Sequence, residues 1–160
     1  MLKKVKSIMI LTIALWGFVG VIHNVADWNG TLGAVSVATS MTSIVGGTDS
    51  WQATSNPLVI WTGALFIMLS KLATGFLCTI GAIGMWRAKD SDNSAYYTAK
   101  NIALTGCAVA IIMLFGGFIV IAESWFELWR SESMIGPVLQ SAFRYGGMIA
   151  LIALFVASKD

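Results

Sequence analysis

Four long apolar stretches constrain this chain of 160 residues more than any other feature of its sequence. They run at about residues 7–25, 58–86, 101–122 and 136–158. A helix needs about 20 mostly apolar residues to cross the hydrocarbon of a bilayer, and each stretch is long enough. Charged residues make up only 11% of the chain, against about 25% in soluble domains. The sequence therefore predicts an all-α membrane protein, a single transmembrane domain over residues 1–160 with four transmembrane helices in a bundle.

The lysines and arginines outside these stretches predict the orientation of the bundle. Cytoplasmic loops carry an excess of such residues. They gather before the first stretch, between the second and third, and after the fourth: Lys3, Lys4, Lys6, Arg87, Lys89, Lys100 and Lys159. We therefore expect both termini in the cytoplasm, and the first and third loops outside, which in a bacterium is the periplasm. The first stretch has the pattern of a signal peptide, but we interpret it as a retained helix.

The first outer loop, residues 26–57, is too long for a simple connection. Its apolar residues at 32–45 approach helical spacing and alternate with serines and threonines. This pattern predicts a periplasmic interfacial helix between transmembrane helices 1 and 2, which Gly46 and Gly47 would end. Aromatic residues near the same boundary indicate an interfacial belt or a docking surface, and the interface candidates are Trp125, Phe126, Trp129, Trp28 and Trp51.

Three ionisable side chains, Lys71, Glu123 and Arg144, lie inside or at the edge of the apolar stretches. A charge in the bilayer costs several kcal/mol, so each side chain should face protein, water or a partner charge. Three solutions remain open for Lys71 in the middle of its helix: it is neutral, it pairs with an acid, or it lines a wet cavity. We expect Glu123 and Arg144 to form an ion pair that fixes the register of two helices or lines a ligand path.

The remaining polar candidates follow the first apolar stretch. His23 is the single histidine of the chain and stands beside Asn24 and Asp27. One histidine without a second histidine or a nearby thiolate is a weak metal ligand. We predict hydrogen bonds from His23 to Asn24, Asp27 or the third loop, no metal and no cofactor, while a bound lipid remains open.

Small residues recur along the second, third and fourth stretches, where they allow helix backbones to approach closely. The fourth stretch has Gly146, Ala150, Ala153 and Ala157 on one face. Such faces serve either internal packing or self-association. The two cysteines, Cys78 and Cys107, lie within apolar stretches, and we interpret them as buried free thiols.

The segment at 123–131, Glu-Ser-Trp-Phe-Glu-Leu-Trp-Arg-Ser, and Ala-Phe-Arg at 142–144 resemble the bacterial small integral membrane proteins known as domain of unknown function 2165. The polar residues at 24–29 resemble the opening of that family's outer loop. The resemblance implies a four-span fold in the bacterial inner membrane and no particular activity. Arg130 stands where the family has Gln, and Lys71 stands where an acidic residue is expected.

Two functions from different classes fit these observations. The first is a small accessory or interaction subunit of an inner-membrane assembly, or a homo-oligomer, without catalysis of its own. The second is a small-molecule, lipid or ion-handling protein with a polar cavity around Lys71, Glu123 and Arg144. An enzyme acting on lipid or quinone through Glu123, Glu127 and His23 is disfavoured, because the sequence has no phosphate-binding glycine loop or nucleophile elbow. We expect membrane lipids and membrane subunits as partners, and no nucleic acid at a net charge of +2.

Overall fold

The computed structural model describes residues 1–90 and 93–159, and this part of the chain is helical without any strand. Four helices are long and apolar enough to cross a membrane. The first two are Leu2–Ala26 (α1) and Pro57–Ala88 (α3). The third, Asn93–Trp125, consists of α4 (Asn93–Ile111) and its continuation η2 (Ile112–Trp125). The fourth, Glu132–Ala157, consists of α5 (Glu132–Met134), η4 (Ile135–Gln140) and α6 (Ser141–Ala157). The predicted all-α membrane fold with four spanning helices is confirmed.

Each helix begins before the apolar stretch that predicted it. The difference is largest for the third, which was expected at 101–122 and runs from Asn93 to Trp125. The fourth was expected at 136–158 and runs from Glu132 to Ala157. Hydropathy marks only the part of a helix that suits hydrocarbon, whereas backbone hydrogen bonding continues the helix through polar turns beyond it.

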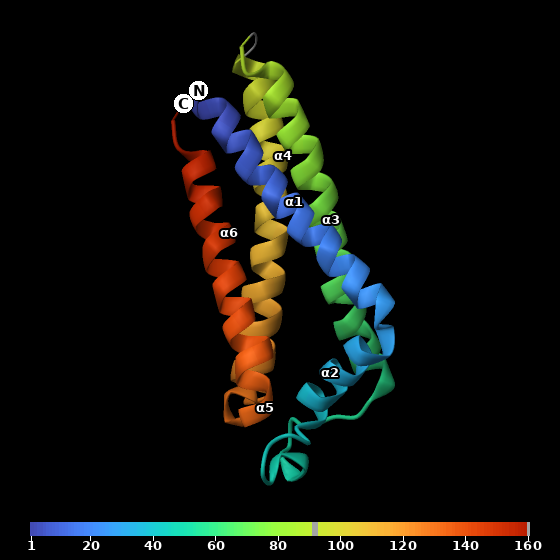
Figure 1. Ribbon diagram of the computed structural model, residues 1–160. Helices are drawn as coiled ribbons and strands as arrows, with labels where there is room; N and C mark the ends of the chain where they lie inside the picture. Colours follow the sequence, from blue (N-terminus) through green and yellow to red (C-terminus); the bar gives the residue numbers. More distant parts are fainter. Residues whose placement is uncertain (91–92, 160) are drawn as a thin grey trace.

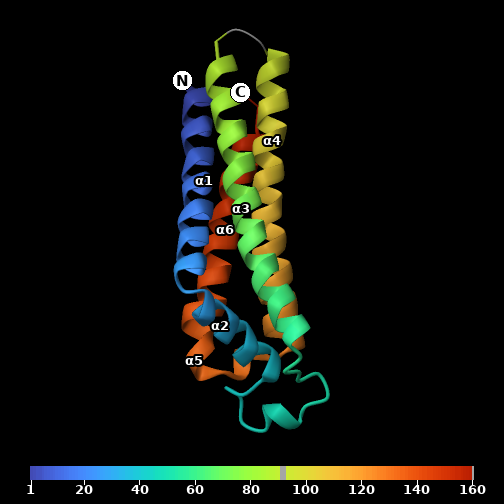
Figure 2. The same ribbon diagram turned by 90° about the vertical axis from the view of Figure 1, so that its right-hand side faces the viewer.

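The helix α3 packs between α1 and α4, and α6 lies against α4 and η2 (Figures 1 and 2). Both termini lie at the end of the bundle where α3 leads to α4, and α2 (Trp28–Ser40), η1 (Gly47–Asp49) and α5 lie at the opposite end. We refer to these as the terminal end and the loop end. Toward the loop end α1 and α6 diverge (Figure 1).

Small residues bring α3 close to both of its neighbours. A Cβ atom on Gly17 of α1 would lie 2.7 Å from the backbone oxygen of Lys71 and 3.0 Å from the backbone nitrogen of Gly75. On the other side, a Cβ atom on Gly81 would lie 2.6 Å from the backbone nitrogen of Ala103 in α4. The small residues of α3 therefore serve internal packing, as one of the two interpretations of these faces expected.

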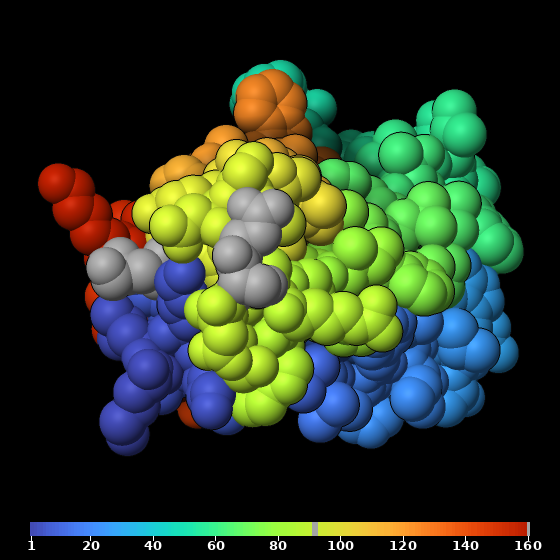
Figure 3. Space-filling view, turned by 90° about the horizontal axis from the view of Figure 1, so that it is seen from above, coloured from blue at the N-terminus to red at the C-terminus, as the bar shows by residue number. Residues whose placement is uncertain are grey.

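The final turn of α6 is held at the terminal end by two buried lysines. The backbone oxygen of Ser158 accepts hydrogen bonds from Lys6 Nζ at 2.7 Å and from Lys100 Nζ at 2.9 Å. The last carbonyls of a helix have no intrahelical donor and carry partial negative charge, so cations are favoured there. Figure 3 looks onto this end and shows the first residues beside the region where α3 ends and α4 begins, where Lys3 Nζ donates to Asn93 Oδ1 at 2.9 Å.

Two stretches of the bundle are π-helical, η2 over Ile112–Trp125 and η4 over Ile135–Gln140. In this geometry the hydrogen bonds span five residues instead of four, and such turns are rare and frequently lie at functional sites. Ser124 Oγ accordingly donates to the backbone oxygen of Ile119 at 2.9 Å. Because the turn is wider, residues in these stretches do not share faces as α-helical spacing predicts.

The helix of the first long loop, α2, covers Trp28–Ser40, whereas the prediction placed it at 32–45. Its start is fixed by Asp27, whose Oδ1 accepts a hydrogen bond from the Gly30 backbone nitrogen at 2.9 Å, as an N-cap residue does. The predicted end at Gly46–Gly47 is wrong. Met41 ends the helix in the left-handed conformation, with φ of 55°. Its fully buried side chain packs with Ile44 and Phe126.

Candidate ligand-binding cavity

A cavity of about 780 Å³ lies near the loop end of the bundle. Its walls come from the end of α1, from α2, from the first half of α3, from η2 and from the segment that leads through α5 into η4. The helix α2 closes one side and packs closely on α3, since a Cβ atom on Gly63 would lie 3.0 Å from Val35 Cγ1.

Most of the cavity wall is apolar. The apolar side chains come from all the walls: Ala34, Val35, Ala38, Leu58, Val59, Phe66, Ile67, Phe118, Ile121, Ala122, Phe126, Leu128, Met134 and Val138. The polar side chains are His23, Asn24, Asp27, Thr31, Thr39, Thr62 and Lys71. A largely apolar wall with a few polar groups is the usual composition of a small-molecule site in proteins.

Lys71 enters this cavity from the middle of α3 and is half-buried. Its ammonium nitrogen donates a hydrogen bond to Asn24 Oδ1 at 2.8 Å. The stem of the side chain lies over Gly20 of α1, where an added Cβ would be 2.9 Å from Lys71 Cδ. The absence of a side chain at Gly20 therefore makes room for the lysine to reach Asn24.

Asn24 is itself held by α2. Its amide nitrogen donates to Thr31 Oγ1 at 3.3 Å, and that hydroxyl lies 3.1 Å from the backbone oxygen of Asp27. These contacts connect Lys71 through Asn24 to the first turn of α2. The sequence singled out Lys71 apart from Asn24 and Asp27, and in the structure all three residues line one cavity.

Lys71 makes no ion pair with any carboxylate that the structure describes. The ion pairs among the described residues join Lys89 to Asp90 and Arg130 to Glu127. Outside the spanning segments, the hydrogen bond from Lys89 holds the pKa of Asp90 below its usual range. Pairing with an acid, one of the three solutions left open for Lys71, is therefore not seen among the described residues, and Lys71 lines a cavity whose wall is mostly apolar.

The ion pair expected between Glu123 and Arg144 is not formed in the described part of the chain. Arg144 is exposed on α6, and its guanidinium donates to Ser141 Oγ at 3.0 Å. Neither Glu123 nor Arg144 lines the cavity. Glu123 lies within the π-helical stretch η2, and Arg144 lies in the first turn of α6, directly after η4. The wider turns of these stretches change the faces that α-helical spacing assigned to the two residues.

His23 lines the cavity with an exposed side chain. None of its predicted side-chain hydrogen bonds is present among the described residues, since only the backbone oxygen of His23 accepts a bond, from the Asp27 nitrogen at 3.0 Å. Thr31 and Thr62, and the apolar wall, were not singled out from the sequence. The pair Gly17 and Gly20 in the first stretch was the available signal for a close helix contact beside Lys71.

The five interface candidates differ in exposure. Trp51, Trp125 and Trp129 are 82%, 51% and 58% exposed, and Trp28 is half-buried against Trp61 with 5.6 Å between ring centroids. Phe126 lies inside the structure, 7% exposed, against Met41 and Ile44. Its side chain is therefore not available to a docking surface, because the loop after α2 covers it.

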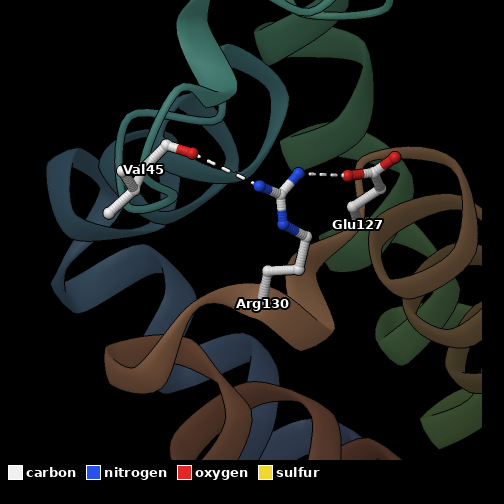
Figure 4. Close-up of polar contacts among 3 residues, drawn as sticks. All are labelled: Val45, Glu127 and Arg130. Atoms are coloured by element: carbon white, nitrogen blue, oxygen red, sulfur yellow. Dashed lines mark hydrogen bonds and ion pairs between the residues drawn. The ribbon is translucent and has the colours of Figure 1, made fainter.

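The loop end is fastened by polar contacts at Arg130. Its guanidinium donates to Glu127 Oε2 at 2.6 Å and to the backbone oxygen of Val45 at 3.3 Å (Figure 4). The contacts join the loop after α2 to η3 (Leu128–Arg130). Leu128 of η3 is fully buried and lines the cavity, so this connection forms part of the cavity wall at the loop end.

The fold and the cavity define a four-span integral membrane protein with a ligand-sized cavity near one end. The chain belongs to the family of predicted small integral membrane proteins of domain of unknown function 2165, whose family model matches residues 2–159. The resemblance inferred from the sequence is thereby confirmed. Neither the curated proteins nor the solved structures contain a match to the chain.

Proposed function

We propose that this protein binds a partly apolar small molecule or lipid in the cavity beside Lys71. The observation that carries the proposal is the combination of about 780 Å³ of mostly apolar cavity with a lysine held at its wall. Pockets for drug-sized ligands measure about 300–1,000 Å³ and combine apolar walls with a few placed polar groups. This proposal keeps Lys71 from the sequence-based hypothesis and replaces Glu123 and Arg144 with Asn24 and Thr31.

The construction of the walls supports a binding role. Part of the wall, from Gly117 to Ala122, belongs to the π-helical stretch η2. Such π-helical turns are rare in proteins and frequently lie at functional sites. An apolar cavity is a poor site for water, since a buried water needs two to four polar partners. A molecule with an apolar part suits it better.

The test makes the same substitution, alanine to phenylalanine, at one position inside the cavity and at one position outside it. Ala34 lines the cavity from α2, and Ala108 is an exposed residue of α4 outside it. The protein and the variants Ala34→Phe and Ala108→Phe are purified from their own membrane, and co-purified small molecules are extracted and quantified by mass spectrometry. We expect the amount of one specific co-purified molecule to fall at least about tenfold in Ala34→Phe and to stay unchanged in Ala108→Phe. Equal molecule profiles for all three proteins would refute the proposal.

A second candidate function, an accessory subunit or homo-oligomer, is favoured by the exposed indoles at the loop end. Trp51 and Trp125 pack edge-to-face with 5.1 Å between ring centroids, and Trp129 is exposed nearby in sequence. Exposed tryptophans are enriched where proteins associate and also in the interfacial belt of a membrane. Crosslinking in native membranes followed by mass spectrometry tests this candidate. A lone monomer would exclude it, and loss of a crosslinked partner in Trp129→Ser would support it.

We further propose that the protein resides in a bacterial inner membrane with both termini in the cytoplasm. The support is the positive charge gathered at the terminal end of the bundle, including Lys3, Lys4 and Arg87. Alkaline phosphatase fused after the last residue should be inactive, and the same enzyme inserted after Gly46 should be active. The reverse pattern would invert the topology.

A further inference from the structure

We infer that the ligand of this cavity is a single-chain amphiphile with one carboxylate, which Lys71 binds while the chain lies against the apolar wall. The inference rests on the proposed function and names the chemical class of its ligand. It is carried by the contrast between the donors that Lys71 offers and the acceptors that surround it.

The ammonium of Lys71 has more donors than the described residues use. A protonated lysine has three N–H donors and no acceptor. The structure provides one acceptor, Asn24 Oδ1 at 2.8 Å, and no carboxylate among the described residues pairs with Lys71. An ammonium facing an apolar cavity with one neutral partner is costly unless a further acceptor is supplied. A ligand oxygen in the cavity would be that acceptor.

The position of the ammonium is fixed by contacts within the protein. The lysine stem lies over Gly20, and Asn24 is held in place by Thr31 Oγ1 at 3.3 Å from its amide nitrogen. Because the amide nitrogen points to Thr31, the amide oxygen is directed at Lys71. Such preorganisation reduces the ordering cost of binding. A charge-assisted hydrogen bond to a carboxylate is also stronger than one between neutral groups.

The surrounding charges favour a single negative charge on the ligand. The titratable groups that line the cavity besides Lys71 are His23 and Asp27. The Asp27 carboxylate already accepts from the Gly30 nitrogen as the cap of α2, and it would repel further negative charge. The ligand therefore faces one cation, Lys71, and the cavity wall also carries one carboxylate, Asp27. This balance of charge suits a ligand with a single negative charge better than a phosphate monoester, which carries more.

The size and composition of the wall favour one apolar chain. The volume of about 780 Å³ lies in the range of about 300–1,000 Å³ that encloses drug-sized molecules. The wall beyond the polar group is made by residues such as Val35, Ile67, Phe118 and Val138. An alkyl chain buried there gains about 0.8 kcal/mol for each methylene removed from water. A fatty acid therefore satisfies both parts of the cavity.

The test uses the full-length protein in nanodiscs of phosphatidylcholine and a fatty acid that carries a photoactivatable diazirine in its chain. Mass spectrometry maps the labelled residues, and palmitic acid, its methyl ester and hexadecyl phosphate serve as competitors. We expect labelling on α2 and η2, with palmitic acid competing at least about tenfold better than the ester and better than the phosphate, as one charge-assisted hydrogen bond implies.

Three variants assign the preference to Lys71. In Lys71→Met the acid should lose its advantage over the ester. In Asn24→Asp the new carboxylate pairs with the lysine and repels the ligand. The acid should therefore again lose its advantage of at least about tenfold over the ester in competition. Lys4→Met removes the same charge from an exposed position at the terminal end and should keep the preference. Asn24→Asp retains the lysine and tests the inference even if Lys71→Met does not fold.

The outcomes separate the inference from the function on which it rests. Equal competition by acid and ester in the unmodified protein would overturn the carboxylate assignment and leave a lipid-binding cavity. Stronger competition by hexadecyl phosphate would overturn it in favour of a phosphate. Retention of the acid preference in Lys71→Met or Asn24→Asp would also overturn it. If no residue of the cavity is labelled in a saturable way, the proposed function itself fails.

Discussion

Gly17 lies where α1 crosses α3, and its replacement by alanine tests whether backbone contact sets the position of the wall that holds Lys71. A Cβ atom at this position would lie 2.7 Å from the Lys71 backbone oxygen and 3.2 Å from Gly75 Cα. Both atoms are backbone, so α1 and α3 must separate. Overpacking of this kind costs about 1–3 kcal/mol, whereas alanine gains about 1 kcal/mol over glycine in a helix. We expect a net destabilisation of up to about 2 kcal/mol.

Gly147 provides the matched control for this substitution. It lies inside α6, is exposed, and an added Cβ would meet no atom within 4 Å. Gly147→Ala therefore keeps the helix gain of about 1 kcal/mol without the clash. The helix term is common to both variants, so the difference between their free energies of unfolding isolates the packing cost, about 1–3 kcal/mol.

The free energy of unfolding is measured by titration with sodium dodecyl sulfate in mixed micelles, with tryptophan fluorescence and circular dichroism as the two probes. Coincident transitions of the probes justify a two-state treatment. The close contact between α1 and α3 would be refuted if Gly17→Ala were as stable as Gly147→Ala. The same result would remove the argument that Gly17 sets the distance between these helices.

Three further predictions use the same unfolding measurement. Lys6→Met and Lys100→Met should each lower the free energy of unfolding by about 1.5–3 kcal/mol, the value of a hydrogen bond to a charged group. Hydrogen exchange in the last turn of α6 should accelerate in both variants, and unchanged exchange would contradict the prediction. Asn24→Leu removes the acceptor of Lys71 and should cost about 1–3 kcal/mol; a more stable variant would show that the bond is unimportant. Arg144→Met should change stability by no more than about 0.5 kcal/mol, whereas breaking a buried ion pair would cost about 3–5 kcal/mol.

Much of the candidate site could be anticipated residue by residue, but not as an arrangement. Lys71 was recognisable because a lysine in the middle of a membrane-spanning stretch must face protein, water or a partner charge. Its partner Asn24 and its neighbour Asp27 were recognisable as polar residues after the first stretch. That Lys71 meets Asn24 and not an acid depends on the level at which α1 crosses α3. Gly17 permits this close crossing, and the sequence of a single segment does not reveal where it occurs.

The errors have the same origin. Glu123 and Arg144 were paired because both were expected near the loop end of neighbouring antiparallel α-helices. Glu123 lies within one π-helical stretch and Arg144 follows another, and this geometry alters which residues share a face. Phe126 was assigned to the surface with its aromatic neighbours, but the loop after α2 folds back over it. Local patterns carry no information on these long-range contacts.

The amino-acid sequence by itself determined the fold class, the four spanning helices and the family. These depend on apolar length and local motifs, since hydrocarbon admits only segments that satisfy their own backbone hydrogen bonds. Only the tertiary structure decided that α1, α2, α3 and η2 together surround a cavity and that Lys71 meets Asn24 there. Crossing positions and helix rotation arise from contacts between distant segments such as Gly17 and Gly75, and such contacts exist only once the helices have packed.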